Sequence, residues 1–321
     1  MRIMREKIIE RILRTARVPD LLEVLTGRLS QSDLQSLLLE VYRRRAGTLT
    51  PGHLMQQYEG NRFVQPAGVD PRQLLEFDRL AYSLLPPSFE VIELSPVCPL
   101  GTSSVVAPVH QDNVVTTIRN TEVCSDSTNV LALECARRRR GSGRGKGHPE
   151  VDTKLCASHR LLRPHLPHDP ASFPHFRIFS LCTAGRDRGS YGFEIEALRE
   201  HLDFYLRLLQ SAGEAGFRLG AVRTRITVFD ESRYPVLKAE VLEALSRSYP
   251  DVEFMFDQDQ ESGQGYYSGV RFKIYARDQA GTEYFLVDGG FTDWTQQLSS
   301  NRKERLLISG MGSERFVSIF A

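Results

Sequence analysis

Residues 306–320, LLISGMGSERFVSIF, break an apolar run with two glycines and place a Glu-Arg pair before a second apolar run. Gly310 and Gly312 remove side chains from the approach to Arg315, and glycine allows a bulky ligand to come close to the backbone. Arginine carries a permanent charge on a planar fork that suits phosphate oxygens. Taken alone, the stretch fits either a strand-to-helix turn with a surface ion pair or an anion-binding turn.

The composition excludes several classes of protein. The chain has 321 residues and a formal net charge of +1, so no global field favours nucleic acid or acidic lipid. No apolar run approaches the length of about 20 residues that a transmembrane helix needs, so we expect no membrane partner. The N-terminus lacks the apolar core of a secretory signal. Five cysteines, an odd number, then predict a reducing, cytoplasmic location.

The residue pattern of the chain changes near residue 61. Residues 1–60 predict a helical N-terminal arm, in which Ser32 and Gln35 would cap one helix. Residues 61–321 predict a core, because β-branched and aromatic runs bounded by turn residues are typical of strands. These predicted strands lie at 89–94, 177–181, 223–229, 252–256, 270–276, 284–290 and 305–310.

Two apolar periodicities in the core predict helices over 193–213, with Gly213 just past its end, and over 234–250. Residues 278–281 predict the turn of a hairpin. Hairpin-linked strands with few helices predict an α+β fold in which helices flank an antiparallel sheet.

A basic low-complexity segment, residues 137–150, has two interpretations. It is either a disordered surface loop or a flexible contact to phosphates, including those of RNA.

Five stretches then follow one another in order. They are LCASHRLLRP (155–164), FPHFRIFSL (173–181), GYYSGVRFKIYA (265–276), VDGGFTDW (287–294) and GMGSER (310–315). This succession resembles the class II aminoacyl-tRNA synthetase core, and within it the lineage of histidyl-tRNA synthetase and the ATP phosphoribosyltransferase regulatory subunit. The resemblance covers residues 85–321 and implies an antiparallel sheet, a bent ATP and a homodimer.

The resemblance implies an ATP site with Mg²⁺. Arg160 would hold the α-phosphate and Arg315 the γ-phosphate, which makes them the expected catalytic pair. The two glycines before Arg315 would let the nucleotide lie against the strand. The ring that stacks on adenine would be Phe176, or Phe179 if the register shifts by three. Residues 167–175 would form the loop beside the nucleotide.

The resemblance also implies a site for an amino-acid-like substrate. In VCSDSTNVLALECA (123–136) an acidic residue, then a threonine two places on, match the segment that meets the substrate's amino group. Paired tyrosines would line the pocket, and a glycine pair with an acidic residue would belong to the substrate-side strand. These residues are Asp126, Thr128, Tyr266, Tyr267, Gly289, Gly290 and Asp293.

The chain also departs from the family's pattern. Leu162 stands where the second motif carries a glutamate, and Ile178 and Cys182 stand where Gln and Glu face the reacting groups. If Phe179 is the ring that stacks on adenine, the positions of that Gln and Glu fall instead at Leu181 and Gly185. Because the sequence ends six residues after its last arginine, we expect no anticodon-binding domain.

Two functions from different classes follow. The first is a ligase that binds ATP, activates an amino-acid-like carboxylate as an adenylate and passes it to an acceptor, either tRNA or a protein. The second is a non-catalytic regulatory or binding subunit that senses a small amino acid and acts through a partner protein. The arginines favour the first, which is the function we expect from the sequence, and the lost polar groups favour the second as the alternative.

Overall fold

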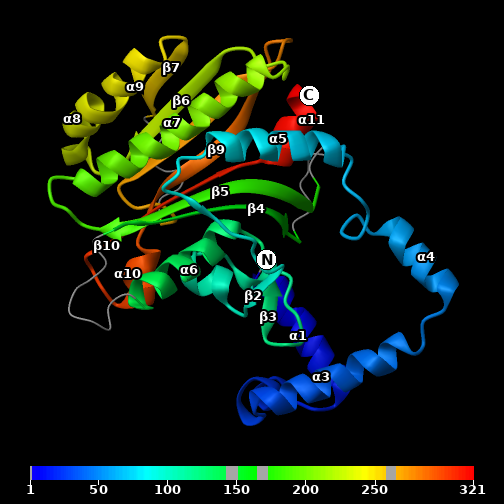
Figure 1. The fold of residues 1–321 in the computed structure, drawn as a ribbon. Helices are drawn as coiled ribbons and strands as arrows, with labels where there is room; N and C mark the ends of the chain where they lie inside the picture. The colour runs from blue at the N-terminus through cyan, green and yellow to red at the C-terminus, as the bar shows by residue number, and fades with distance from the viewer. Residues whose placement is uncertain (1, 142–150, 165–172, 258–264) are drawn as a thin grey trace. The chain divides into compact units, whose positions relative to one another are not determined.

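The computed structural model describes residues 2–141, 151–164, 173–257 and 265–321. Residues 142–150 of the basic segment and 165–172 of the predicted nucleotide loop lie outside the described residues. The chain separates into two compact units (Figure 1). The smaller unit contains residues 1–61 and 116–121, and the larger unit contains residues 62–115 and 122–321.

The smaller unit is helical. Its elements are α1 (Arg2–Ala16), α2 (Leu21–Glu23), the π-turn η1 (Val24–Arg28), α3 (Gln31–Ala46) and α4 (Pro51–Gly60). Helix α3 begins after Ser30, whose hydroxyl accepts a hydrogen bond from the Asp33 amide at 3.1 Å. The prediction that Ser32 caps this helix was therefore wrong, because the chain leaves its extended conformation two residues earlier.

The larger unit is built on one mixed sheet. Among the described residues, eight strands pair in the order β1-β4-β5-β10-β9-β8-β6-β7. Neighbours are antiparallel except at the two edges, where β1 pairs with β4 and β6 with β7 in parallel. The strands are β1 (Glu90–Val91), β4 (Thr153–Leu162), β5 (His175–Arg186), β6 (Val222–Val228), β7 (Val252–Asp257), β8 (Val270–Arg277), β9 (Glu283–Thr292) and β10 (Glu304–Met311). The predicted α+β fold is confirmed, and the sheet is mixed rather than wholly antiparallel.

Helices pack on both faces of this sheet (Figure 1). One face carries α5, α7 and α11, and we call it the α7 face. The other carries α6 and α10 over β4, β5 and β10, and we call it the α6 face. The long helices and their partners are α5 (Pro71–Leu84), α6 (Ser127–Gly141), α7 (Gly192–Glu214), α10 (Trp294–Ser299) and α11 (Ser313–Phe320).

The remaining elements are short. Helices α8 (Tyr234–Leu237), η5 (Lys238–Leu242) and α9 (Glu243–Ser248) share the span predicted as one helix. The others are β2 (Val97–Pro99), β3 (Thr121–Val123), η2 (Thr102–Val106), η3 (Gln111–Asn113) and η4 (Glu231–Arg233). No helix among the described residues is long and apolar enough to cross a bilayer.

The largest difference from the sequence prediction is β4. Its residues TKLCASHRLL contain little β-branched or aromatic character, so the strand was not predicted. Conversely, the predicted strand over 89–94 is reduced to the two residues of β1. Helix α7 runs past Gly213, and its end is set by Gly216, whose φ of +100° lets Phe217 N donate to Ala212 O at 3.0 Å.

A buried polar group links α7 to the sheet. His201 is fully buried, and its ring nitrogens are hydrogen-bonded to Thr183 Oγ1 at 2.9 Å and Ser309 Oγ at 2.8 Å. Tyr205 Oη lies 3.1 Å from the same serine. Burial lowers the pKa of His201 from 6.5 to about 3, because a charged ring would lose its hydration. The folded protein therefore holds this histidine neutral.

We predict that His201 makes the protein less stable in acid. The unfolded chain protonates this residue below its ordinary pKa of 6.5, whereas the folded protein resists protonation down to about 3. Its contribution is therefore fully present above pH 6.5 and falls by about 1.4 kcal/mol per pH unit as acidity increases through that window. Urea unfolding of the wild type and His201→Gln at a series of pH values measures the difference. A difference independent of pH would contradict the prediction.

Candidate functional site

Strand β4 places Arg160 on the α7 face. Side chains alternate between the faces of a sheet, and Ser158, two residues earlier, donates to Asp78 of α5 at 2.9 Å. Arg160 forms an ion pair with Glu314 of α11 at 2.8 Å, and its Nη1 lies 2.9 Å from His175 Nδ1. Arg160 is therefore engaged at the edge of the α7 face.

The neighbouring strand completes this ionic network. Arg177 of β5 pairs with Asp78 at 2.7 Å, and its backbone amide donates to Glu314 at 3.1 Å. Glu314 is 6% exposed, so it depends on these donors for its charge. Arg160, Arg177, Asp78 and Glu314 balance one another in charge. Arg160 thus has a structural partner where the resemblance implies a phosphate.

The sequence interpretation missed Arg163, which lies just past β4 on the α6 side. Its Nε donates to the carbonyl oxygen of Ser125 at 2.9 Å, and Nη2 lies 3.4 Å from Asp126 Oδ2. Its guanidinium also stands 5.1 Å from the centre of the Phe176 ring. Counting alternate residues from Leu161 along β4 would have indicated this side, but β4 itself was not predicted.

The two candidate stacking rings lie on opposite faces of β5. Phe179 is fully buried and stacks on Phe204 of α7 with ring centres 5.7 Å apart. Protein atoms therefore occupy the space that an adenine would need, and the alternative of Phe179 as the stacking ring is incompatible with the fold. Phe176 is half-buried on the α6 face beneath Arg163. Of the two, only Phe176 can reach a ligand.

Asp126 and Thr128 lie together at the start of α6. Asp126 Oδ1 accepts from the Thr128 amide at 2.9 Å and from its hydroxyl at 2.8 Å, which caps the helix. Its other oxygen, Oδ2, faces Arg163. Asp126 therefore lies on the α6 face with one oxygen in the helix cap and the other paired with Arg163.

Aromatic rings stand beside this carboxylate. Tyr266 and Tyr267 pack edge to face with centres 4.8 Å apart, and Tyr266 packs against Trp294 at 5.4 Å. Burial raises the pKa of both tyrosines, so each hydroxyl stays protonated and can donate. The charge of Asp126 raises the pKa of Tyr266 further. Asp126 and the tyrosines thus belong to one region.

A cross-strand ion pair borders this region and was not predicted. Arg271 of β8 donates to Asp288 of β9 through Nε at 2.9 Å and Nη2 at 3.1 Å. The guanidinium also lies 5.4 Å from the centre of the Tyr267 ring. Such two-bond pairs are well oriented and hold both side chains in place. Arg271 and Asp288 therefore fix the position of Tyr267.

The predicted glycine pair divides between the two faces. A Cβ at Gly290 would stand 2.5 Å from Tyr267 Cδ1 on the α6 face, whereas one at Gly289 would stand 2.5 Å from Phe272 Cζ in the core of the α7 face. Gly289 therefore lies apart from the predicted substrate site. Asp293 is exposed after the last residue of β9, at the opposite end of that strand from the GMGSER turn. The fold does not bring it toward Arg315.

The GMGSER turn joins β10 to α11. A Cβ at Gly310 would meet Ile178 Cγ2 at 3.0 Å, so packing against β5 also requires a small residue there. Gly312 precedes the first turn of α11, and Arg315 is exposed in that turn without an ion pair to any described residue. Cys182 is fully buried beneath α6, 3.9 Å from the carbonyl oxygen of Thr128. Ile178 and Cys182 therefore make this part of the α6 face apolar.

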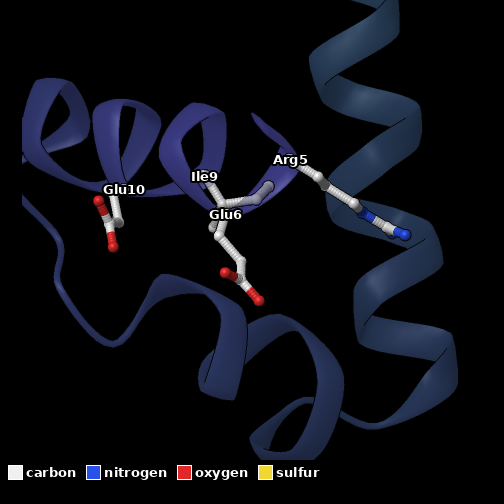
Figure 2. Close-up of a pocket in the computed structure, with 4 residues that line it drawn as sticks. All are labelled: Arg5, Glu6, Ile9 and Glu10. Atoms are coloured by element: carbon white, nitrogen blue, oxygen red, sulfur yellow. The ribbon is translucent and has the colours of Figure 1, made fainter. Parts of the chain in front are cut away.

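Two surface pockets of the described residues do not coincide with the candidate site. One surface pocket is lined by residues of α1 alone: Arg5, Glu6, Ile9 and Glu10 (Figure 2). Another lies between α7 and α9 and is lined by residues that include Ile195, Glu200 and Leu245. Neither contains a residue predicted for the site.

Solved structures share this fold at low sequence identity. An ATP phosphoribosyltransferase regulatory subunit/histidyl-tRNA synthetase from Bacillus halodurans C matches with a TM-score of 0.58 and 14% identity, over 81% of this chain and 83% of that one. The apo histidyl-tRNA synthetase of S. aureus matches with a TM-score of 0.55 and 14% identity, over 79% and 69%. A histidine–tRNA ligase subunit from Alicyclobacillus acidocaldarius subsp. acidocaldarius DSM 446 matches at 0.55 and 12%, over 79% and 96%.

The chain has a class II synthetase-like fold. The sequence itself matches no protein-family model and no curated protein. At these identities the likeness concerns the backbone architecture, and the functions of such folds depend on the residues at their sites.

We predict that Gly290→Ala displaces Tyr267. The added methyl group would overlap the tyrosine ring and the Val270 carbonyl oxygen at 2.8 Å, so the free energy of unfolding should fall by about 1–3 kcal/mol. Gly213→Ala is the matched control, because nothing lies within 4 Å of that position in α7 and alanine favours a helix. Urea unfolding measures both. Equal stability of the two variants would show that Tyr267 does not need the space at Gly290.

Proposed function

We propose that the chain is a non-catalytic binding module whose ligand is a small, amino-acid-like molecule with a protonated amine. The observation that carries this proposal is the group of Asp126, Tyr266 and Tyr267 on the α6 face. The Asp126 carboxylate, which caps α6 and lies 3.4 Å from Arg163, would attract an ammonium group, and the two protonated tyrosines offer hydroxyl oxygens beside it. The module would act by changing shape or affinity toward a partner protein when this ligand binds.

We do not assign adenylation to this chain, because the residues that would hold the phosphates of ATP are incomplete. Arg160 is held by Glu314 and His175, and Leu162 carries no charge for a metal or a nucleotide. Ile178 and the buried Cys182 are apolar side chains at positions where a reaction would need preorganised polar groups.

Magnesium does not fit the described residues. Mg²⁺ prefers carboxylate and phosphate oxygens, but Glu314, the carboxylate beside the glycine turn, is nearly buried and already accepts from the Arg160 guanidinium and the Arg177 backbone amide. Among the described residues no group of three or more His, Cys, Asp or Glu side chains could hold a metal ion.

A second candidate, the ATP-dependent ligase, retains one supporting observation. Arg315 is exposed beside Gly312 in the first turn of α11, where a phosphate oxygen could be bound by the guanidinium and by free backbone amides. Phe176 could then receive the adenine ring. In this case an amino-acid-like carboxylate would be activated and passed to tRNA or a protein.

For either function we propose a homodimer, as the likeness to synthetase-like structures supports. A subunit that responds to a ligand without catalysis also needs a surface through which the change is transmitted.

We predict that Asp126→Asn weakens ligand binding by about tenfold or more, because the amide keeps the helix cap but removes the charge that attracts an amine. Calorimetric titration of the wild type with each of the twenty amino acids would first identify the ligand. The same titration is then repeated with the N-acetyl form of the amino acid that binds, and this form should not bind. Asp293→Asn is the matched control and should bind like the wild type. Equal affinities for the amine and its N-acetyl form would contradict the proposal.

The ligase candidate makes a separate prediction. If ATP binds, Arg315→Ala should weaken binding by about tenfold, because one charge-assisted phosphate contact is lost, while Arg302→Ala at an exposed arginine should not. Pyrophosphate exchange is then measured with ATP and each amino acid. We expect no exchange with any of them. Pyrophosphate exchange with a single amino acid would show that the chain is a ligase and not a non-catalytic binding module.

A further inference from the structure

Part of the α6 face carries a group of cations that, apart from Arg271, neither proposed function uses. Beyond β9, no helix among the described residues packs extensively on the α6 side of β8 and β6. The alternation of these strands directs four basic residues to that surface: Arg223 and Arg225 of β6, and Arg271 and Lys273 of β8. Their neighbours on the same strands, among them Ile226 and Phe272, belong to the core of the α7 face.

Two of the four cations are neutralised within the sheet. Arg223 pairs with Glu253 of β7 at 3.1 Å and with Glu283 of β9 at 2.6 Å. Arg271 pairs with Asp288 as described above. Both arginines are therefore held in ion pairs within the sheet, and the carboxylates of their acidic partners are already engaged.

Arg225 and Lys273 are different. They stand directly opposite each other on paired strands, and neither forms an ion pair with a described residue. The Nε of Arg225 is shielded from solvent and has no hydrogen-bond acceptor among the described residues. Like charges directly opposite each other destabilise a sheet, and a buried donor without an acceptor adds to that cost. Asp288, which stands opposite Lys273 on β9, is engaged by Arg271, so neither cation of this pair is neutralised by a described residue.

Aromatic rings hold the two cations in place. The guanidinium of Arg225 lies 5.1 Å from the centre of the Tyr275 ring, and Lys273 Nζ lies 5.9 Å from that of Phe285. These rings pack against each other with centres 5.6 Å apart. Cations resting on aromatic faces keep their charge while losing side-chain freedom. The two donors are thus preorganised on one side of the sheet.

We propose that Arg225 and Lys273 form a binding site for a phosphate group on a small molecule. A phosphate carries up to two charges and several acceptor oxygens, which match one guanidinium fork and one ammonium group. The carboxylates of Asp288, Glu253 and Glu283 lie on the strands around this pair. They would repel a long polyanion, so a small phosphate compound fits better than a nucleic acid. This site does not depend on either proposed function.

The experiment titrates the full chain with inorganic phosphate and with pyrophosphate by calorimetry, in a low-salt Tris chloride buffer. Succinate serves as the dicarboxylate probe. Lys273→Gln and Arg225→Gln keep a polar side chain but remove the charge, and each should weaken phosphate binding by about tenfold or more. Lys238→Gln, at an exposed lysine on η5, is the matched control and should bind like the wild type.

A second measurement covers the case in which a variant changes the fold. Thermal unfolding without phosphate should leave both variants at least as stable as the wild type, because they relieve the repulsion between the two cations. Phosphate should raise the unfolding temperature of the wild type and of Lys238→Gln only.

Three outcomes would overturn the proposal. The first is no binding of either phosphate probe by the wild type, or equal binding by Lys273→Gln and Lys238→Gln. The second is succinate binding as tight as phosphate binding, which would make this a carboxylate site. The third is a self-association in ultracentrifugation that Lys273→Gln abolishes, because the cations would then pair with carboxylates of a second copy of this chain.

Discussion

Side chains of a strand alternate between the two faces of its sheet, and this constraint decides which residues of the larger unit can meet. Arg160 and Arg163 are three residues apart and lie on opposite sides. Gly289 and Gly290 are adjacent, yet each makes room for an aromatic ring in a different layer. Every assignment of a ligand to this fold therefore depends on the register of the strands.

The charged side chains on the two faces of the sheet differ in how completely they are paired. On the α7 face, Arg160, Arg177, Asp78 and Glu314 form a balanced network that joins β4 and β5 to α5 and α11. Removing one member of a largely buried pair leaves an uncompensated charge, so the network is suited to holding helices rather than to exchanging ligands. On the α6 face, Asp126 is paired with Arg163 at the start of α6, whereas Arg225 of β6 and Lys273 of β8 form no ion pair with a described residue.

This division explains why the fold does not by itself establish an activity. The backbone is that of class II synthetase-like structures, but an adenylating site needs several polar groups converging on one nucleotide. Here Arg160 is paired with Glu314, and Ile178 and Cys182 are apolar. The residues that could meet an amine are instead grouped together.

The sequence by itself determined the α+β class, most strand positions and helix α7, because apolar periodicity and turn residues are local properties. Its resemblance to the synthetase family also indicated Asp126, Thr128 and the paired tyrosines as candidate site residues. It did not reveal β4, whose Cys, Ala, Ser and His residues lack a strand-like composition. Only the tertiary structure decided the face of each residue, the choice between Phe176 and Phe179, and the pairing of Arg271 with Asp288. These depend on which strands become neighbours, and contacts between segments distant in sequence leave no local pattern to read.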